Sequence, residues 1–571
     1  MKKVLFFLVF LTYYICFSQP SEKYPKQFFS SPMKIDIEPS GTFGELRGNH
    51  FHSGLDFKTQ KKEGFDVYAV ADGFISRIKY STSGYGKAIY ITHSNGFTTV
   101  YAHLQESNSE IEKYIKNKQY EKQSFEIELF PKKDELKVKK GDLIAYSGNS
   151  GGSSGPHLHF EYRDTATEEI INPLNFGLDK GFKDLISPVL QNVWVYPLSD
   201  SSVVNKSAIK SNLVFNKLKG NNFIANKITA QGPIGFGINS YDMYNGHFNH
   251  NGVYRIAMIV NGSPYYIVTF DRFSFADTRY INSYIDYEHK MTKNETIQKL
   301  FYKNKFPLSL IASNTKDGVI DVKPGDNYNV IIKVYDFNEN VTEITIPVVY
   351  DQAGANSTVN TKKTDFYLKA NRQNIYEDNY VNVSIPKNTF VDDFYLDFTV
   401  ANNTLNLHKD IIPGYQNMII EFDTEKMDLK DFDINKAFIA ETSGKNPTYL
   451  KTSIKGQKLS ARTKNLGTYQ ILMDTIAPKI YGLSFADGDN LDAINSIKVL
   501  ISDNLSGIQN YKAFINDKWI LMDYDYKTKS LVHNLKDGIF VDGVNNFKIE
   551  VSDRVGNTTV SEVKFTKSKP N

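Results

Sequence analysis

The 571-residue chain has almost no cysteine, since Cys16 is its single thiol. Cys16 lies in an N-terminal stretch that we expect to be removed, so the remaining chain would have no disulfide and no thiolate chemistry. The folded protein must then be held by its hydrophobic cores alone. A lipid anchor on Cys16 is disfavoured, because Ile15 before it is bulky for a lipoprotein processing site.

Net charge is also scarce. The 67 basic and 64 acidic side chains leave +3, which is too little to indicate a nucleic-acid partner. Beyond the N-terminus no apolar run approaches the roughly 20 residues of a spanning helix. Phe and Tyr are abundant, at 39 and 36 residues, and together with many Val, Ile and Thr they favour strands over helices. We therefore predict a mainly β protein with no integral membrane segment after leader removal.

The first 18 residues have the pattern of a secretory signal peptide. Lys2 and Lys3 precede an apolar run from Val4 to about Phe17, and Ser18 is a suitable last residue before cleavage. This run is shorter than a spanning helix, which disfavours a membrane anchor. We predict an exported protein of the periplasm, the cell envelope or the medium.

Three or four domains are expected from the length. Residues 19–178 alternate apolar segments with glycine turns, which predicts a small antiparallel β domain. "HSNGF" predicts a hairpin turn with positive φ at both Asn95 and Gly96. A polar insert lies between Gln105 and Val138, with a short helix expected near residues 109–118.

The remaining chain contains a weak internal repeat. "DLISP" starting at Asp184 resembles "DTIAP" starting at Asp474, and later Asp336 and Asn340 recur as Asp553 and Asn557. This repeat predicts two immunoglobulin-like β-sandwich modules, at 184–350 and 474–567. The first is longer, so we expect an insertion in it around residues 276–305. A polar linker at 351–363 and a third β unit at 364–473 would separate the two modules.

Six of the eleven histidines precede residue 164. In "HLHFEYR", the period of two places His157, His159 and Glu161 on one strand face and the intervening apolar residues on the other. Imidazoles so placed lie about 6.5–7 Å apart, so one can bind a metal while the other reaches a water on that metal. Alone, this H-x-H pattern favours a polar strand face with two solvated histidines.

His52 and Asp56 offer a second pair of ligands. In an extended strand they would lie about 13 Å apart, so sharing an ion requires a turn or bulge, which Gly54 permits. Two imidazoles and a carboxylate form a suitable zinc set, and three protein ligands leave a position for water. Alternation along "VYAHL" predicts that His103 shares a strand face with Tyr101. Each pattern alone also fits an ordinary β hairpin.

Three blocks together carry a resemblance: "GTFGELRGNHFHSGLDF", "HSNGFTTVYAHL" and "KKGDLIAYSGNSGGSSGPHLHFEYR". In this order, over about residues 40 to 175, they resemble the lysostaphin/LytM-type zinc endopeptidase family, whose members cut peptidoglycan with a small antiparallel β core. The resemblance implies that His52, Asp56 and His159 hold one zinc ion. It also implies that His103 and His157 form the catalytic pair.

Two further histidines are assigned by position. His50 could compete with His52 as a ligand, but the spacing of His52 to Asp56 fits better. His93 is expected in the hairpin turn, with a structural role. The chain contains no H-E-x-x-H, so the helical zincin arrangement is absent.

We therefore expect an exported zinc endopeptidase that hydrolyses the peptide cross-links joining peptidoglycan stems. A histidine would act as general base on zinc-activated water, and the sequence leaves open whether His103 or His157 is the main base. Glu161 is expected to orient a histidine, and the glycine–serine loop before His157 to form a flexible rim of the substrate groove.

The long C-terminal part keeps other functions open. Its β modules could position the enzyme, cover the groove or bind a protein partner. One alternative is therefore a scaffold that recruits or activates another cell-wall hydrolase. Another alternative is a peptidase that acts on a protein.

Overall fold

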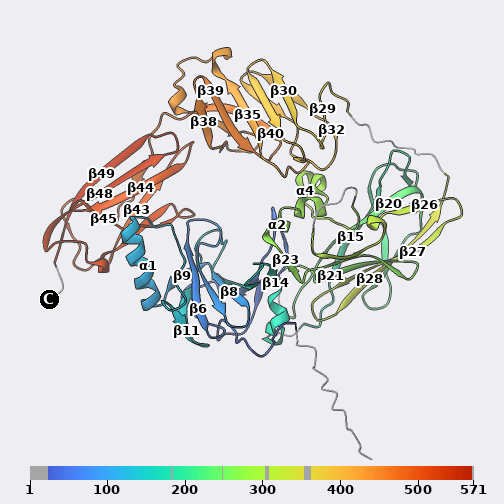
Figure 1. Cartoon of the computed structure of the whole chain (residues 1–571), viewed down its shortest axis with the longest axis horizontal. Helices are drawn as coiled ribbons and strands as arrows, with labels where there is room; N and C mark the ends of the chain where they lie inside the picture. The colour runs from blue at the N-terminus through green and yellow to red at the C-terminus, as the bar shows by residue number, and fades with distance from the viewer. Residues whose placement is uncertain (1–22, 182–183, 247, 303–307, 353–361, 569–571) are drawn as a thin grey trace, which may run out of the picture.

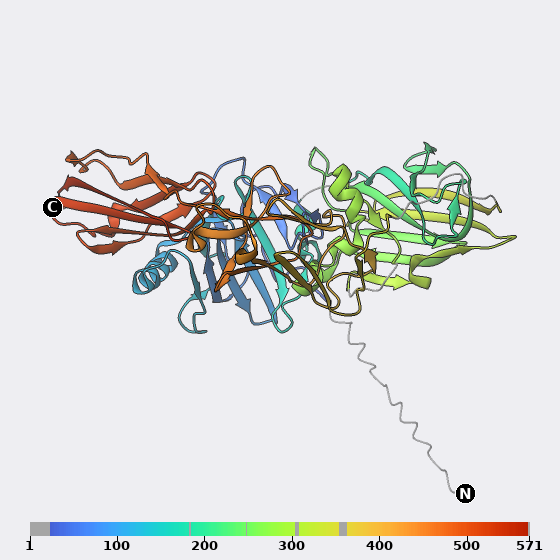
Figure 2. The same cartoon turned by 90° about the horizontal axis from the view of Figure 1, so that it is seen from above.

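A computed structural model describes residues 23–181, 184–246, 248–302, 308–352 and 362–568. The predicted signal peptide, most of the predicted linker and part of the predicted insertion lie outside these ranges. The described chain is mainly β, as predicted. Within it, no helix combines the length and apolar character needed to cross a membrane. Four β-rich regions follow one another around a ring (Figure 1), which Figure 2 shows from above.

The first region is built on an antiparallel sheet with strand order β1-β4-β13-β8-β7-β6-β10. A smaller sheet of order β5-β12-β9 and the hairpin β2-β3 accompany it. Its elements are β1 (Pro39–Gly41), β2 (Leu46–Arg47), β3 (His50–Phe51), β4 (Leu55–Lys58), β5 (Asp66–Tyr68), β6 (Gly73–Tyr80), β7 (Lys87–His93), β8 (Phe97–Ala102), β9 (Leu104–Ser107), α1 (Ser109–Lys122), β10 (Ile127–Leu129), β11 (Lys137–Val138), β12 (Leu143–Ser147), β13 (His157–Asp164) and β14 (Ile170–Ile171).

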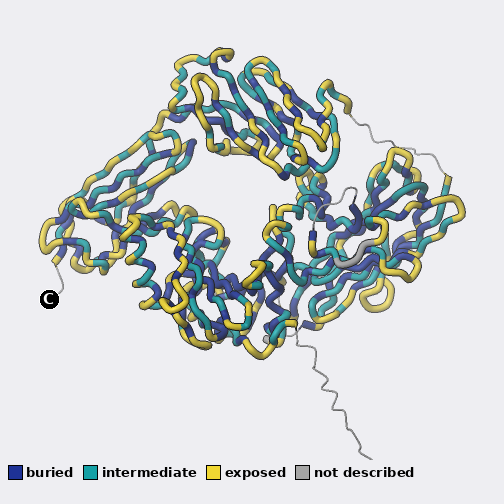
Figure 3. The backbone as a smooth tube through the Cα atoms, viewed as in Figure 1, coloured by how far each residue is buried: buried dark blue, intermediate teal, exposed yellow. Residues whose placement is uncertain are grey.

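Strand β13 carries "HLHFEYR" at the centre of this sheet, between β4 and β8. Its Leu158, Phe160 and Tyr162 are fully buried in the hydrophobic core, so the predicted alternation is confirmed. Figure 3 shows how such buried segments concentrate along the strands of each region. The opposite face of β13 is thereby free to present polar side chains.

Two local predictions in this region need correction. Helix α1 continues to Lys122, beyond the expected end at 118, and the Asn108 side chain accepts a hydrogen bond from the Ile111 N–H at its start. Between β7 and β8, Gly96 has a positive φ of 85° whereas Asn95 does not. The turn therefore needs one left-handed residue, because three residues rather than two connect the strands.

The second region wraps its strands around one core, and β20 belongs to both layers. The first residues of β20 pair with β28 and the later ones with β15. Gly232, with φ of 77°, lies where the strand changes partner. The elements are β15 (Val189–Pro197), β16 (Val203–Val204), β17 (Ser211–Asn212), β18 (Phe215–Lys217), β19 (Asn222–Ala225), β20 (Ile228–Tyr241), β21 (Arg255–Val260), β22 (Ser263–Thr269), β23 (Arg272–Phe273), α2 (Phe275–Thr278), α3 (Ile281–Tyr284), α4 (Tyr287–Lys293), β24 (Gln298–Lys299), β25 (Ile311–Asn314), β26 (Ile320–Val322), β27 (Asn327–Tyr335) and β28 (Val341–Tyr350).

The third region has two five-stranded sheets, of order β30-β31-β35-β39-β38 and β33-β34-β40-β36-β37, around a single core. Its strands are β29 (Tyr367–Leu368), β30 (Asn374–Asp378), β31 (Val381–Ile385), β32 (Phe394–Tyr395), β33 (Phe398–Ala401), β34 (Thr404–Leu407), β35 (Met418–Asp423), β36 (Ala437–Glu441), β37 (Thr448–Tyr449), β38 (Thr452–Lys455), β39 (Lys458–Thr463) and β40 (Gly467–Met473).

The fourth region pairs a sheet of order β41-β43-β47-β46 with one of order β42-β49-β48-β44-β45. Its strands are β41 (Lys479–Tyr481), β42 (Asp489–Asn490), β43 (Ser496–Ser502), β44 (Ile508–Ile515), β45 (Lys518–Ile520), β46 (Asp523–Asp525), β47 (Ser530–Asn534), β48 (Gly543–Asp553) and β49 (Thr558–Lys567).

Direct contacts close the ring. Strand β14 of the first region pairs with β23 of the second, and Lys436 of the third donates to the Val555 carbonyl of the fourth. The fourth region returns to α1 of the first (Figure 1). There Tyr120 donates a hydrogen bond to Asp537 over 2.6 Å. The last region of the chain is therefore packed against the region that carries the histidine motifs.

Candidate metal centre

Three side chains that the sequence analysis assigns to zinc converge on one point. His52 Nε2 lies 3.1 Å from Asp56 Oδ1 and 3.0 Å from His159 Nδ1. His159 Nδ1 lies 2.8 Å from the same aspartate oxygen. All three residues are buried, at 2–4% exposure. The three atoms are close enough to share one small cation.

The remaining polar atoms of this cluster are held by neighbours. The Nδ1–H of His52 donates to the Thr42 carbonyl over 2.7 Å, and the Nε2–H of His159 donates to Glu161 over 2.9 Å. These bonds fix both tautomers, so the two ring nitrogens that face Asp56 present lone pairs. Three acceptor atoms therefore face one another, an arrangement that a bound metal ion satisfies.

Gly54 allows His52 and Asp56 to approach each other across the short segment between β3 and β4. A Cβ at this position would lie 2.4 Å from the Phe160 carbonyl oxygen and 2.9 Å from His159 Cε1. The expected turn is therefore present, but glycine is required because β13 passes so close, and not because of a positive φ.

The predicted catalytic histidines lie beside the cluster. The ring centres of His103 and His157 are 4.8 Å apart, and His157 Nε2 is 3.5 Å from Asp56 Oδ1. The Nδ1–H of His103 donates to the Ser150 carbonyl over 2.9 Å, and that of His157 to the Gly155 carbonyl over 2.8 Å. Each ring therefore keeps its Nε2 available as a proton acceptor.

The predicted strand face of His103 is wrong. Tyr101 pairs with Phe160 on the core face, and Ala102 pairs with His159. Strict alternation would therefore direct His103 into the core. Instead β8 ends at Ala102, and His103 has a φ of 58°, which turns its ring towards His157. A positive φ at a non-glycine residue is uncommon and is concentrated at functional sites.

Electrostatics separate the roles of these histidines. Burial, and then the neighbouring His159 and His157, lower the pKa of His103 to about 3, so this ring is neutral. Burial opposes a charge on His159, but the hydrogen bonds of Asp56 and Glu161 outweigh it and raise the pKa of His159 to about 9. In the absence of metal a proton therefore competes for His159.

Several contributing residues were not recognised in the sequence. An Arg47 guanidinium nitrogen donates to Asp56 Oδ2 over 2.8 Å, on the side away from the histidines. Ser53 donates to Glu161 over 2.6 Å, and the Tyr85 hydroxyl also donates to this carboxylate. Arg47 and Ser53 lie inside the first motif block, as does Asp56, but the partner of Ser53 is Glu161 on the distant strand β13.

A groove of about 980 Å³ opens over the cluster. Asp56, His103 and His157 line it, together with the glycine–serine loop 152–156. Asn249 of the second region also lines it, so the groove is not formed by the first region alone.

The glycine–serine loop is tied at several points. The Gly152 N–H donates to the Gly84 carbonyl over 2.8 Å, and Lys527 of the fourth region donates to the Ser153 carbonyl over 3.2 Å. The predicted rim of the groove is therefore present and in contact with the fourth region. Its flexibility stays a prediction.

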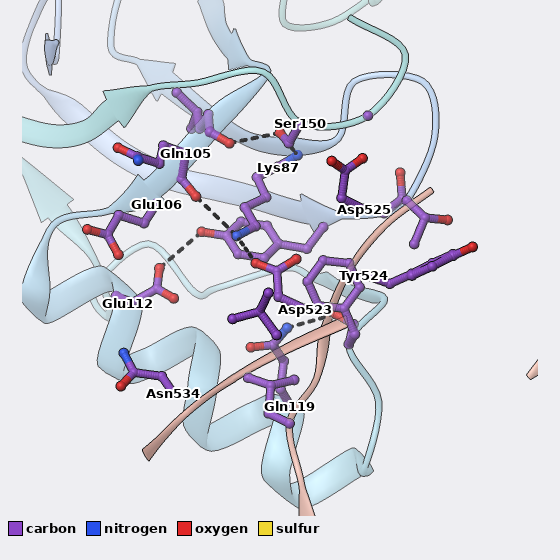
Figure 4. Close-up of a pocket in the computed structure, with 18 of the residues that line it drawn as sticks. Lys87, Gln105, Glu106, Glu112, Gln119, Ser150, Asp523, Tyr524, Asp525 and Asn534 are labelled. Atoms are coloured by element: carbon purple, nitrogen blue, oxygen red, sulfur yellow. Dashed lines mark hydrogen bonds and ion pairs between the residues drawn. The ribbon is translucent and has the colours of Figure 1, made fainter. Parts of the chain in front are cut away.

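A separate pocket lies between the first and fourth regions (Figure 4). Lys87 bridges it, donating to Asp523 over 2.5 Å and to the Gln105 carbonyl over 3.0 Å. Glu112 accepts from the Tyr80 hydroxyl on the other side. The interactions of Lys87 and Asp523 across this pocket join the first region to the fourth.

The two histidines assigned by position lie elsewhere. His50 is exposed on β3, and the described cluster contains His52 instead. His93 is the last residue of β7 and not part of the turn, which corrects the predicted location. Its ring is buried and bonds the Asp72 carbonyl and the Thr99 hydroxyl, in keeping with a structural role.

Comparison with known families identifies two segments. Residues 50–120 and 125–173 match the model of peptidase family M23, which confirms the family resemblance of the motif blocks. Residues 365–474, which span the third region, match the model of the Zu5-like domain.

Two known relatives each match less than a third of this chain. An uncharacterized metalloprotease of Haemophilus influenzae is 30% identical over 168 residues, which cover 28% of this chain and 30% of that protein. The DD-carboxypeptidase/endopeptidase Mpg of Neisseria meningitidis serogroup B is 32% identical over 149 residues, covering 26% and 27% respectively. The chain thus spans less than a third of the length of these relatives. The solved catalytic domain of lysostaphin from Staphylococcus simulans is 23% identical, covering 24% of this chain and 91% of that one, with a TM-score of 0.19.

Proposed function

We propose, from the M23 peptidase segment at residues 50–173, that the protein is an exported zinc endopeptidase that hydrolyses peptide cross-links of bacterial peptidoglycan. The convergence of His52 Nε2, Asp56 Oδ1 and His159 Nδ1 within 3.1 Å carries this proposal. The signal peptide predicted at residues 1–18 supports export. The peptidoglycan substrate rests on the resemblance of the three motif blocks.

In this proposal His52, Asp56 and His159 hold one zinc ion. When bound, the ion acidifies a water molecule and polarises the scissile carbonyl. Thr42 and Glu161 keep the two imidazoles oriented, and Arg47 holds the second oxygen of Asp56. A small, buried set of two nitrogens and one carboxylate oxygen suits zinc better than calcium or magnesium.

His157 is the proposed general base. Its Nε2 lies on the open side of the cluster, at the groove, and its Nδ1–H is held by the Gly155 carbonyl. It accepts the proton of the attacking water and returns a proton to the leaving amine. The pKa of His103 is lowered to about 3, which makes His103 a poor proton acceptor. His103 is then suited to positioning the water or the substrate.

The test combines metal analysis with hydrolysis of purified peptidoglycan. Asp56→Ala and His159→Ala should lose bound zinc and reduce wall hydrolysis to background, because each removes one of three ligands. His50→Ala is the matched control, since His50 is exposed and two residues from His52. Zinc is measured by elemental mass spectrometry, and released peptides by mass spectrometry of the digest.

Hydrolysis by a zinc-free wild-type preparation would contradict this mechanism. A protein that clears no wall alone, but stimulates another hydrolase in the presence of chelator, would support the scaffold alternative. Cleavage of a protein substrate without release of cross-linked stem peptides would assign a different substrate class.

A further inference from the structure

A second three-residue cluster lies in the second region, near the point where the chain enters it. The carboxylates of Asp184, Asp242 and Asp336 offer oxygens that all lie within 4.8 Å of one another. These residues are only 4%, 1% and 1% exposed. They come from three separate segments: just before β15, directly after β20, and the turn between β27 and β28. The fold, and not local sequence, brings them together.

Several oxygens in this cluster are buried without a hydrogen-bond donor. They are Asp184 Oδ2, Asp242 Oδ1 and the side-chain oxygen of Asn251. Asp242 and Asn251 exchange two backbone hydrogen bonds of 2.9 Å, so as cross-strand neighbours their side chains lie on the same side of the pair. No salt bridge to a lysine or arginine joins the three aspartates within the described ranges. Burying such oxygens unpaired is costly.

The crowding of these carboxylates also raises their pKa values. Burial and the neighbouring carboxylates raise the pKa of Asp242 to about 9. Burial, partly offset by the Ile186 N–H, and the charge of Asp336 raise the pKa of Asp184 to about 7.

The fourth region contains the equivalent positions, which are Asp474, Asp503 and Asp553. In both regions an asparagine four residues after the last aspartate locks the site: Asn340 and Asn557 each donate to that aspartate and to the backbone carbonyl of the first one. The internal repeat in the sequence therefore marks the same structural position twice.

The two clusters differ in how their carboxylates are satisfied. In the fourth region, Asp474 accepts from the Ile476 and Ser506 N–H groups, and Asp503 accepts from Leu505 and Gly507. These four backbone donors satisfy both oxygens of Asp474 and one oxygen of Asp503, while Asp503 Oδ1 is buried without a donor. In the second region Asp184 accepts only from the Ile186 N–H, and three oxygens, Asp184 Oδ2, Asp242 Oδ1 and Asn251 Oδ1, are buried without a donor.

We propose that Asp184, Asp242 and Asp336 bind one calcium ion, with the Asn251 side-chain oxygen beside it. The available ligands are all oxygens, which suit hard cations and not zinc. Calcium accepts several protein oxygens in irregular geometry, whereas magnesium retains most of its waters, which a buried site excludes. This site is separate from the proposed peptidase function and does not depend on it.

The position of the cluster gives the ion a structural consequence. Asp184 lies where the chain leaves the first region, and Asn251 precedes Gly252, whose N–H donates to the Thr42 hydroxyl over 3.0 Å. The Thr42 carbonyl in turn accepts from His52. The ion would therefore fix both the junction between the regions and the segment that reaches the groove through Asn249.

The test is calcium titration of the purified full-length protein in buffer stripped of divalent cations. Wild type should bind one Ca²⁺ by isothermal titration calorimetry, and saturating Ca²⁺ should raise the Tm of the second region by roughly 5–10 °C. Asp242→Asn should abolish both effects. Asp503→Asn is the matched control at the equivalent position and should leave both unchanged. Asp56→Ala should also leave them unchanged, which separates this site from the peptidase centre.

Absence of calcium binding at millimolar Ca²⁺ would overturn the proposal. A calcium response that is lost in Asp503→Asn but persists in Asp242→Asn would also overturn it. A higher Tm of Asp242→Asn in calcium-free buffer, without any response to Ca²⁺ in wild type, would show that the cluster holds only protons.

Discussion

The His52–Asp56–His159 centre and the Asp184–Asp242–Asp336 cluster both gather three buried side chains from separate segments. They differ in what surrounds the converging atoms. In the first, Thr42 and Glu161 occupy the histidine nitrogens that face away from the centre. In the second, buried oxygens remain without donors. A centre with fixed lone pairs is prepared for a tightly bound metal, whereas crowded carboxylates exchange protons and cation according to pH.

The largest effect is expected for the replacement of His157, which distinguishes a metal ligand from a proton acceptor in the first centre. His157→Ala should lower kcat/KM for wall hydrolysis by about 10²–10⁴-fold while zinc content stays at the wild-type level, because the base is removed and the ligands remain. Steady-state hydrolysis and elemental analysis of the same preparation check this. Loss of zinc together with activity would make His157 a ligand and remove the proposed division of roles.

The aspartate cluster should make the stability of the second region depend on pH. Its folded-state pKa values are raised, to about 9 for Asp242 and about 7 for Asp184, so between the ordinary value of 3.8 and these values the folded state binds more protons than the unfolded state. Stability therefore falls as pH rises in this window, by on the order of 4–7 kcal/mol between pH 5 and 8 without calcium.

Thermal melts of the second region across this pH range test the sign. Calcium should flatten the dependence, and Asp242→Asn should reduce it, because this variant removes the carboxylate with the larger shift in pKa and leaves Asp184. A stability that rises with pH in calcium-free buffer would contradict the raised pKa values and the comparison built on them.

Gly54→Ala should disturb the first centre and spare the second. The added Cβ would meet the Phe160 carbonyl at 2.4 Å, so β13 and His159 must shift, at a cost of roughly 1–3 kcal/mol of stability and with weaker zinc binding. Gly48→Ala is the control, because nothing lies within 4 Å of its Cβ position. Zinc titration and melts measure both variants, and an unchanged zinc affinity in Gly54→Ala would show that the close approach of β13 is not needed.

The smallest effect concerns the amide-capped cluster of the fourth region. Asp503→Ala removes the acceptor of the Leu505 and Gly507 N–H groups and should destabilise that region by about 1 kcal/mol, with or without calcium. Chemical denaturation in both buffers checks this. Calcium-dependent destabilisation would mean that both clusters bind the ion, and the contrast between them would disappear.

Local periodicity in the sequence predicted part of the first centre correctly. Alternation along β13 separated His157 and His159 from the buried Leu158 and Phe160. The same rule failed for His103, because β8 ends one residue earlier and the backbone turns left-handed. A period describes a strand only while the strand continues, and nothing in "VYAHL" marks its end.

The internal repeat marked four of the six aspartates in the two clusters. Asp184, Asp336, Asp474 and Asp553 stood out because their spacing to Pro and Asn recurs along the chain. Asp242 and Asp503 have no shared sequence context and were missed. Each follows a strand that pairs with the segment after the repeated proline, and only this pairing brings the third carboxylate to the other two.

The sequence by itself determined the β character, the alternation of β13 and the residue types able to hold zinc, because these follow from side-chain chemistry and the short-range geometry of strands. Tertiary structure alone decided the direction of His103, the contacts of Arg47 and the packing of the fourth region against the first. It also decided which aspartates lack donors. Burial and hydrogen-bond satisfaction depend on segments distant in the chain, so neither can be read from local pattern.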